Sequence, residues 1–390
     1  MEKKKIKIMY FVSGLISGGV EKMIVNWCWG LGNERYEFII VYQHQPVPQC
    51  LKMLKEAGCR TVQITARSDN FIKNILDSFK ILRLYQPDIV HCNMNLMNFC
   101  ALIPAKMIGI KVRISHSHIA DKRTSFLYQC VERICRFLNN KSATIKMACG
   151  EDASNYLYGG KITTISLKEA THMLKCNKNK KFWKNVAVIV RNAIDLKEFC
   201  YTEDNIRKKL NLNDRIVIGH VGRFTQQKNQ KRLLEIFAEY HKLHADSVLV
   251  IAGTGELKDE LGLHVKKLGI DDSVYFLGVL SNMTEFYSAI DLLLLPSLYE
   301  GFPVVALETQ AAGKPALFSD QIDSTTQVTD LIHFFSLKKS DGKWVEKIDQ
   351  ILKSEYIGDY KREMTEGGYN IDEEIHELDY LYQAAMGEFK

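Results

Sequence analysis

Short apolar runs alternate with amphipathic segments along most of the chain. The runs at 6–12 and 291–297 are apolar over most of their length, as strands buried on both faces of a parallel sheet are. Between such runs, segments like Phe71–Tyr85 carry apolar residues at helical spacing. This alternation predicts an α/β protein with parallel sheets covered by helices on both faces.

The pattern divides into two series of elements. In the first series we predict strands at 6–12, 36–42, 61–65, 88–92, 111–115, 143–149 and 186–192, with helices at 21–31, 49–57, 71–85 and 126–138 among others. In the second we predict strands at 215–221, 247–252, 274–277, 291–296 and 315–319, with helices near 229–242, 256–267, 282–289 and 303–312.

The length of 390 residues also favours two domains of ordinary size. We place the boundary near Arg191–Asp195, which gives an N-terminal domain at 1–192 and a C-terminal domain at 193–372. Residues 373–390 read as an amphipathic helix that packs back on a domain. The lysine-rich segment 160–185 shows no clear periodicity, and we predict a long surface loop or insertion there.

Composition is that of a globular protein, with 46% hydrophobic and 25% charged residues. No apolar run reaches the roughly eighteen residues of a membrane span, and the run at 6–12 is too short for the core of a secretion signal. The ten cysteines show no pairs at metal-binding spacing. We therefore expect a cytoplasmic protein without disulfides or a zinc site.

Charge is distributed unevenly. Residues 1–192 carry 30 Lys and Arg against 13 Asp and Glu, a net charge of +17, whereas the remainder carries 22 against 33, a net charge of −11. A solvated surface could account for any single basic cluster. A whole domain at this charge indicates an anionic partner, and because no nucleic-acid-binding motif occurs, we favour a membrane surface over nucleic acid.

Two carboxylates follow the run at 291–297. Glu300 lies in the loop after this predicted strand, and Glu308 lies about a turn and a half into the next helix, which Pro303 opens. Ligands of open parallel sheets bind outside the carboxyl ends of the strands, where helix N-termini offer free N–H groups to anions. This arrangement suits a ligand with both phosphates and hydroxyls, such as a nucleotide-sugar.

Glycine-containing turns follow three other predicted strands. Gly18 and Gly19 come after the first, Gly222 and Arg223 with Lys228 come after strand 215–221, and Gly253 comes after strand 247–252. Arg223 and Lys228 can place two cations on a diphosphate. The plainer interpretation is a set of tight turns and exposed surface cations.

His116 and His118 lie at the end of strand 111–115. Their spacing puts both on one side of an extended segment, and we predict that one of them lines the reaction site. They could instead be metal ligands, but no third ligand stands out nearby. The sequence contains no P-loop motif, no G-x-S-x-G nucleophile elbow and no Asp-x-Asp pair to hold a metal on a diphosphate.

Together these motifs resemble the retaining glycosyltransferases of family four, and among them the bacterial capsule and exopolysaccharide enzymes. The resemblance covers most of the chain and implies the GT-B fold, in which two Rossmann-like doubly wound domains face each other across a cleft. The matching segments are 18–21, 113–118, 192–195, 222–224 with 228–229, 253–255, 276–278, and 299–303 with Glu308. After Pro315 the chain departs from the pattern, because residues 321–331 contain no glycine-rich donor loop.

The resemblance implies a role for each matching position on the donor. Arg223 and Lys228 would bind the diphosphate of the nucleotide-sugar, and Glu308 would bind ribose hydroxyls. Glu300 would hold hydroxyls of the transferred sugar as part of the catalytic set. Backbone N–H groups in the segment from Phe302 through Pro303 to Val304 would assist Glu300 in holding the sugar.

The remaining positions would complete the site. Val279 would lie near the base, and Gly253 could line the nucleoside. Gly18 and Gly19 would approach the donor from the first domain. His118, or less favourably His116, would lie beside the anomeric carbon.

The resemblance implies a metal-independent hexosyltransferase without a cofactor. It would transfer a sugar, with retention, from a nucleoside diphosphate, for which uridine is the favoured base, to a polyprenyl-diphosphate-linked glycan in cell-surface polysaccharide synthesis. Its location would be the cytoplasmic face of the membrane. Two alternatives remain at this point: a UDP-N-acetylglucosamine 2-epimerase, and a non-catalytic sugar-nucleotide-binding partner of a polysaccharide assembly complex.

Overall fold

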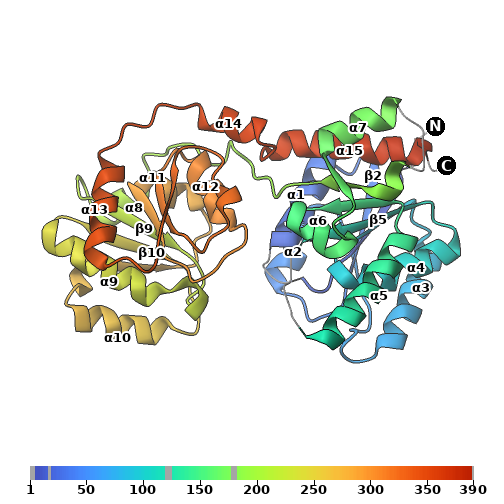
Figure 1. The fold of residues 1–390 in the computed structure, drawn as a ribbon, viewed down its shortest axis with the longest axis horizontal. Coiled ribbons are helices and arrows are strands. Elements are labelled where there is room, and N and C mark those ends of the chain that lie inside the picture. The colour runs from blue at the N-terminus through green and yellow to red at the C-terminus, as the bar shows by residue number, and fades with distance from the viewer. Residues whose placement is uncertain (1–4, 16–18, 119–124, 177–181, 389–390) are drawn as a thin grey trace. The chain divides into compact units, whose positions relative to one another are not determined.

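The computed structural model describes residues 5–15, 19–118, 125–176 and 182–388. Contacts divide the chain into two compact units (Figure 1). Unit 1 comprises Met1–Ala193 and Ile371–Lys390, and unit 2 comprises Ile194–Asn370. The chain thus passes from unit 1 to unit 2 once near residue 193 and returns near residue 370.

Unit 1 is built on an eight-stranded parallel sheet with the order β3-β2-β1-β4-β5-β6-β8-β7. The central strand β1 (Ile6–Phe11) shows why its apolar run forms such a sheet. Ile8 and Tyr10 join the core on one face, and Met9 and Phe11 join the core on the other. The other strands are β2 (Tyr36–Tyr42), β3 (Arg60–Gln63), β4 (Ile89–Cys92), β5 (Val112–Ser117), β6 (Ile145–Ala148), β7 (Thr163–Ser166) and β8 (Val186–Ile189).

Helices cover both faces of this sheet (Figure 1). They are α1 (Gly19–Leu31), α2 (Pro48–Glu56), α3 (Phe71–Tyr85), α4 (Phe99–Ile108), α5 (Phe126–Ser142), α6 (Glu151–Tyr158), α7 (Leu167–Cys176) and the C-terminal α15 (Ile371–Glu388), with 3₁₀ turns η1 (Asn95–Asn98) and η2 (Phe182–Asn185). None of the helices in the described part of the chain combines the length and the apolar character needed to cross a bilayer.

The prediction of a long loop at 160–185 is wrong for most of the segment. Residues Thr163–Ser166 form β7, and Leu167–Cys176 form α7, which packs on α15. The strand is short and pairs only with β8, so its burial pattern is weak. Ala170 is buried in the core, but the many lysines around it hide the helical period in the sequence. Residues 177–181 lie outside the described part of the chain.

Unit 2 repeats the architecture with six parallel strands in the order β11-β10-β9-β12-β13-β14. Along β10 (Val248–Ala252), Val250 faces one core, and Leu249 and Ile251 face the other. The remaining strands are β9 (Val217–Val221), β11 (Val274–Gly278), β12 (Leu292–Leu295), β13 (Ala316–Ser319) and β14 (Ile332–Phe335). The doubly wound parallel fold predicted from the sequence is therefore confirmed in both units.

The helices of unit 2 lie on both faces of this sheet. They are α8 (Ile206–Leu210), α9 (Gln230–Leu243), α10 (Lys258–Leu268), α11 (Met283–Ala289), α12 (Val304–Ala311), α13 (Asp341–Leu352) and α14 (Tyr360–Glu366), with 3₁₀ turns η3 (Gln226–Lys228), η4 (Asp271–Ser273) and η5 (Ser324–Thr326).

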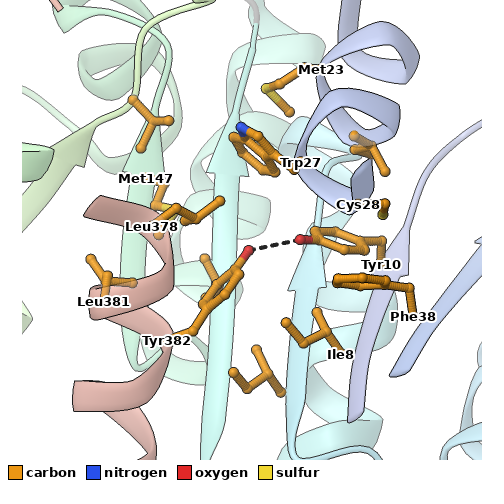
Figure 2. Close-up of a cluster of buried hydrophobic side chains, with 14 of the residues drawn as sticks. Ile8, Tyr10, Met23, Trp27, Cys28, Phe38, Met147, Leu378, Leu381 and Tyr382 are labelled. Atoms are coloured by element: carbon orange, nitrogen blue, oxygen red, sulfur yellow. Dashed lines mark hydrogen bonds between the residues drawn. The ribbon is translucent and has the colours of Figure 1, made fainter. Parts of the chain in front are cut away.

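The C-terminal helix α15 belongs to the core of unit 1. Leu378, Leu381 and Tyr382 pack against the sheet, and the Tyr382 hydroxyl lies 3.0 Å from the hydroxyl of Tyr10 on β1 (Figure 2). On the neighbouring helix α1, the Trp27 indole N–H donates to Glu374 Oε1 at 2.7 Å. Segments separated by more than 340 residues thus share one buried network.

Each sheet has a point where the strand order reverses. In unit 1 it lies between β1 and β4, and in unit 2 it lies between β9 and β12. At such a point the loops leave the two strands in opposite directions, which opens a crevice for a ligand at the carboxyl ends. Ligand-binding residues of each unit are therefore expected in the loops at this point.

Candidate functional site

In unit 2 a buried ion pair spans the reversal point. Lys228 ends the turn η3 after β9, and Glu300 follows β12. Lys228 Nζ lies 2.8 and 2.7 Å from the two carboxylate oxygens of Glu300, and Ser297 Oγ donates to Oε1 at 2.5 Å. The two charged side chains are only 15% and 7% exposed. The sequence predicted both residues for one donor site, and the structure brings them together in direct contact.

Glycines make the neighbouring loops pack closely. The Gly222 N–H donates to Ala252 O at 3.0 Å, and the Gly253 N–H donates to Gly278 O at 2.7 Å, which joins the loops after β9, β10 and β11. Gly253 has φ +135°, and a Cβ there would lie 2.0 Å from Gly222 O. A side chain at this position would therefore separate the loops. The exposed Arg223 lies on the first of them.

The loop after β11 carries the residue predicted for the base. Val279 is 78% exposed and follows Gly278, whose φ of +70° turns the chain at the end of the strand. Val279 offers an apolar surface beside the glycine loops.

Helix α12 begins at Val304, with Pro303 as its N-cap residue. The first N–H groups of a helix have no acceptor within it, so Val304 and Val305 can donate to an anion or a hydroxyl. The half-buried Phe302 stacks on Tyr369, with ring centroids 5.5 Å apart, which fixes the turn that leads into the helix.

Glu308 lies deeper than a simple surface ligand would. Glu308 is only 6% exposed, and its Oε2 accepts a hydrogen bond from the Tyr287 hydroxyl at 2.9 Å. Burial, and then the charge of Glu308, raises the pKa of Tyr287 well above its ordinary value, so this hydroxyl remains a donor. Tyr287 therefore holds the carboxylate in one orientation.

In unit 1, His118 lies at the carboxyl end of β5. Its Nε2 lies 2.9 Å from Asn93 Oδ1, and its backbone N–H donates to Asn95 Oδ1 at 2.7 Å. With Asn93 Oδ1 as acceptor, Nε2 carries the proton and Nδ1 keeps a lone pair. Burial lowers the pKa of His118 to about 3, so the imidazole is neutral near pH 7.

His116, by contrast, belongs to the core. It is fully buried on β5 and lies between Trp27 and His118, whose ring centroids are 6.0 and 4.0 Å away. Its Nδ1 lies 3.2 Å from His91 Nε2, and His91 Nδ1 lies 2.8 Å from the Tyr382 hydroxyl. Burial lowers the pKa of His116 well below its ordinary value. Of the two histidines, His118 is the one at the strand end.

The glycines after β1 are only partly described. Gly19 is exposed and begins α1, and a Cβ there would meet no atom within 4 Å. Gly18 lies outside the described residues. Throughout the described ranges, no three His, Cys, Asp or Glu side chains are grouped as metal ligands.

The sequence prediction missed the residues that orient the candidate groups. Asn93 fixes His118, Ser297 donates to Glu300, and the Asn229 amide donates to Pro296 O at 2.9 Å, which ties the Lys228 turn to the loop after β12. Each of the three follows a predicted strand within a few residues or lies in a glycine loop. Polar residues directly after buried strands were the signal that could have identified them.

The unit that holds the Lys228–Glu300 pair matches a known protein family. Residues 202–371, nearly all of unit 2, match the family described as glycosyl transferases group 1. The chain therefore carries a glycosyltransferase group 1 domain, and the family resemblance predicted from the sequence is confirmed.

Relatives and solved structures match over almost the full chain. The protein EpsF of Bacillus subtilis (strain 168) is 27% identical over 98% of this chain and 97% of its own length. The UDP-Gal:alpha-D-GlcNAc-diphosphoundecaprenol alpha-1,3-galactosyltransferase of Escherichia coli is 23% identical, with 97% of each chain covered. The crystal structure of Anabaena Alr3699/HepE in complex with UDP has a TM-score of 0.68 at 15% identity, with 98% of each chain covered, and shows the shared fold.

Proposed function

We propose that this protein is a retaining hexosyltransferase of bacterial cell-surface polysaccharide synthesis. Its donor is a UDP-sugar, and its acceptor is a hydroxyl of a polyprenyl-diphosphate-linked glycan. The observation that carries the proposal is the Lys228–Glu300 pair at the reversal point of a glycosyltransferase group 1 domain. The Escherichia coli relative, named for UDP-Gal and a diphosphoundecaprenol acceptor, supports the choice of both substrates.

The charge that develops in the reaction lies on the departing diphosphate. Arg223 and Lys228 supply two cations there, and the first N–H groups of α12 add partial positive charge. Such preorganised groups stabilise a leaving group without a metal ion, and no metal or cofactor is part of the proposal. Glu300 holds sugar hydroxyls and Glu308 holds ribose hydroxyls, each oriented by its neighbour Ser297 or Tyr287.

His118 is proposed to lie beside the anomeric carbon. Its imidazole is neutral, so it acts as a hydrogen-bonding group and not as a fixed cation. Its Nδ1 lone pair can accept from a hydroxyl, because Asn93 engages Nε2. The diphosphate itself would then take the proton of the attacking hydroxyl on the face that retention requires.

The helix α5 supports a membrane-bound acceptor. Its apolar side chains Leu127, Val131, Ile134 and Phe137 are each more than half exposed, while its Glu132 and Arg136 pair with each other and are largely buried. The exposed surface of α5 thus carries an apolar stripe of the kind that an ordinary surface helix buries. We call these four apolar residues the α5 face.

Basic groups border the α5 face. Lys141 Nζ lies 5.6 Å from the centre of the Phe137 ring, and Lys106 donates to Lys141 O at 2.9 Å. Unit 1 as a whole has 31 Lys and Arg against 19 Asp and Glu, a net charge of +12. Apolar residues bordered by cations suit the inner surface of an anionic membrane, where a polyprenyl-linked acceptor would be held.

A screen of UDP-sugars by thermal shift, followed by turnover assays, tests the function. A true donor should raise the unfolding temperature of the wild type, and turnover should release UDP with transfer to a lipid-linked acceptor. Glu300→Gln should lower kcat/KM at least a hundredfold, whereas Glu346→Gln, an exposed glutamate on α13, should leave it unchanged. Conversion of the free donor into an epimer, or wild-type output from Glu300→Gln, would refute the proposal.

A further inference from the structure

The reversal point of the unit 1 sheet holds an arginine that the proposed reaction does not use. Arg67 follows β3 and reaches toward the loops after β1 and β4. Its Nη2 donates to Ser13 Oγ at 3.2 Å, its Nη1 lies 3.0 Å from Met94 Sδ, and its backbone N–H donates to Gln43 Oε1 at 3.4 Å. The guanidinium therefore lies between the carboxyl ends of the two strands at which the order reverses.

This guanidinium has only neutral partners in the described parts of the chain. No carboxylate there lies within ion-pair distance of it, and a thioether is a weak acceptor. The residue is half-buried, and burial lowers the pKa of Arg67, which means that its charge is poorly solvated. A partly desolvated cation without a counter-ion destabilises a fold unless it has another use.

Three other half-buried arginines of the described residues have carboxylate or carbonyl acceptors. Arg207 pairs with Asp291 and donates to backbone carbonyls, and Arg136 pairs with Glu132. Arg113, at the amino end of β5, donates to the carbonyls of Ser142, Ile110 and Lys111. Carboxylates or carbonyl oxygens thus accept from these three guanidinium groups, whereas the Arg67 guanidinium has a hydroxyl and a thioether as partners.

The equivalent position in unit 2 clarifies what Arg67 lacks. There the cation Lys228 contacts the carboxylate of Glu300, whereas at the unit 1 reversal point the guanidinium contacts a hydroxyl and a thioether. An anion supplied by a ligand would complete the second site. A guanidinium presents two parallel N–H groups to the oxygens of a phosphate, and buried Arg is suited to this task.

We propose that Arg67 binds phosphate oxygens of the diphosphate that links the acceptor glycan to its lipid. The inference rests on the proposed function and names the part of unit 1 that holds the acceptor's anion. Met94, which contacts Arg67, is adjacent in sequence to Asn93, which holds His118. The anion would therefore be held beside the loop that positions the proposed reaction centre, on the unit that does not carry Arg223 and Lys228.

Titration of inorganic pyrophosphate into the full-length protein tests the binding step. Saturating UDP is present, so that the diphosphate position in unit 2 is occupied. The wild type should bind pyrophosphate, Arg67→Gln should bind it at least tenfold more weakly, and Arg67→Lys should retain part of the affinity. Arg113→Gln is the matched control, since it removes a half-buried arginine at the amino end of β5, and it should bind as the wild type does.

Kinetics with two acceptors distinguish the source of the phosphate. Arg67→Gln should raise KM at least tenfold for a short-chain polyprenyl-diphosphate glycan. It should not change KM for the matching alkyl glycoside, which lacks the diphosphate, or KM for the UDP-sugar. A rise confined to the donor's KM, an equal rise for both acceptors, or unchanged pyrophosphate binding would each overturn the inference.

The two proposals fail in different ways. If the wild type consumes no nucleotide-sugar at all, the proposed function is wrong, yet the pyrophosphate titration still reports on Arg67. If the wild type transfers sugar and Arg67→Gln does so with unchanged acceptor KM, only the inference about Arg67 is wrong. Arg67→Lys keeps the charge, so partial pyrophosphate affinity in this variant would show that the loss in Arg67→Gln follows the missing charge and not a loss of folding.

Discussion

At the scale of single residues, His118 is kept neutral by its surroundings. Its pKa of about 3 results from burial, so the ring stays uncharged at every pH above about 4. We expect kcat/KM of the wild type to show no ionisation of His118 between pH 5 and 8. Asn93→Asp places a carboxylate on Nε2, raises the pKa of His118, and should introduce a loss of activity toward acidic pH.

The pH–rate profile of kcat/KM checks this prediction. His118→Ala serves as the reference, and it should lower kcat at least tenfold without changing the shape of the profile. A wild-type acid limb near pH 6 that disappears in His118→Ala would show that the histidine titrates in the normal range, and the neutral role assigned to it would be wrong.

The sequence predicted these residues individually but not their pairing. Lys228 and Glu300 are 72 residues apart, and each lies in a loop whose path depends on the sheet order. That order, which brings β9 beside β12, is a tertiary property that no local pattern contains. His116 and His118 were equivalent by spacing, and only the depth of β5 in the sheet separates them.

At the scale of elements, the glycine loops of unit 2 depend on close contact between backbones. Gly253→Ala should destabilise unit 2 by about 2 kcal/mol or more, because the residue combines positive φ with a Cβ 2.0 Å from Gly222 O. Binding of UDP should weaken in parallel, since the same loops carry Arg223. The control is Gly262→Ala inside α10, where the Cβ meets nothing within 4 Å.

Chemical denaturation and UDP titration of both variants give the measurement. Gly262→Ala should stabilise the protein by about 0.5–1 kcal/mol, because alanine favours the helix interior. If Gly253→Ala unfolds at the wild-type denaturant concentration and binds UDP normally, the loops tolerate separation and the explanation for Gly253 is incorrect.

The C-terminal helix α15 adds a pH-dependent contribution to stability. Glu374 is buried against Trp27, and burial raises its pKa from 4.5 to about 8. The folded state therefore binds a proton that the unfolded state releases. This contribution is complete below pH 4.5 and is lost as pH rises through about 8, with a magnitude on the order of 4 kcal/mol.

Glu374→Gln keeps an acceptor for the Trp27 indole and removes the titration. Its free energy of unfolding, relative to the wild type, should therefore increase between pH 5 and pH 8. Glu373→Gln, at an exposed position of the same helix, should follow the wild type throughout. Parallel pH curves for the wild type and Glu374→Gln would show that Glu374 does not titrate in this range.

The elements themselves were largely predictable, and the exceptions have a physical reason. Strands buried on both faces, such as β1 and β12, form apolar runs that identify them directly. Where burial is partial the signal fails, as at β7 on the sheet edge, which was read as loop. A short edge strand needs few apolar residues, so its sequence differs little from that of a turn.

At the scale of the whole molecule, charge and apolar surface act together in unit 1. We predict that the α5 face binds anionic vesicles. The double variant Leu127→Ser with Ile134→Ser should lower binding to phosphatidylglycerol-containing vesicles at least tenfold. Each substitution removes the free energy that the apolar side chain gains when it moves from water into the bilayer interface. Leu263→Ser is the control, since Leu263 is equally exposed but lies on α10 of unit 2, whose net charge is −6.

Vesicle flotation at several salt concentrations separates the contributions. Higher salt should weaken binding of the wild type, and neutral phosphatidylcholine vesicles should bind it poorly, because the basic groups beside the α5 face need an anionic partner. The double variant should unfold at the wild-type temperature, since both side chains are exposed. Two results would contradict the prediction: equal binding to both kinds of vesicle, or a dimer that the double variant dissociates while flotation is unaffected. Either result would assign the α5 face to another partner, and the membrane contact of the acceptor would then lie on a different part of unit 1.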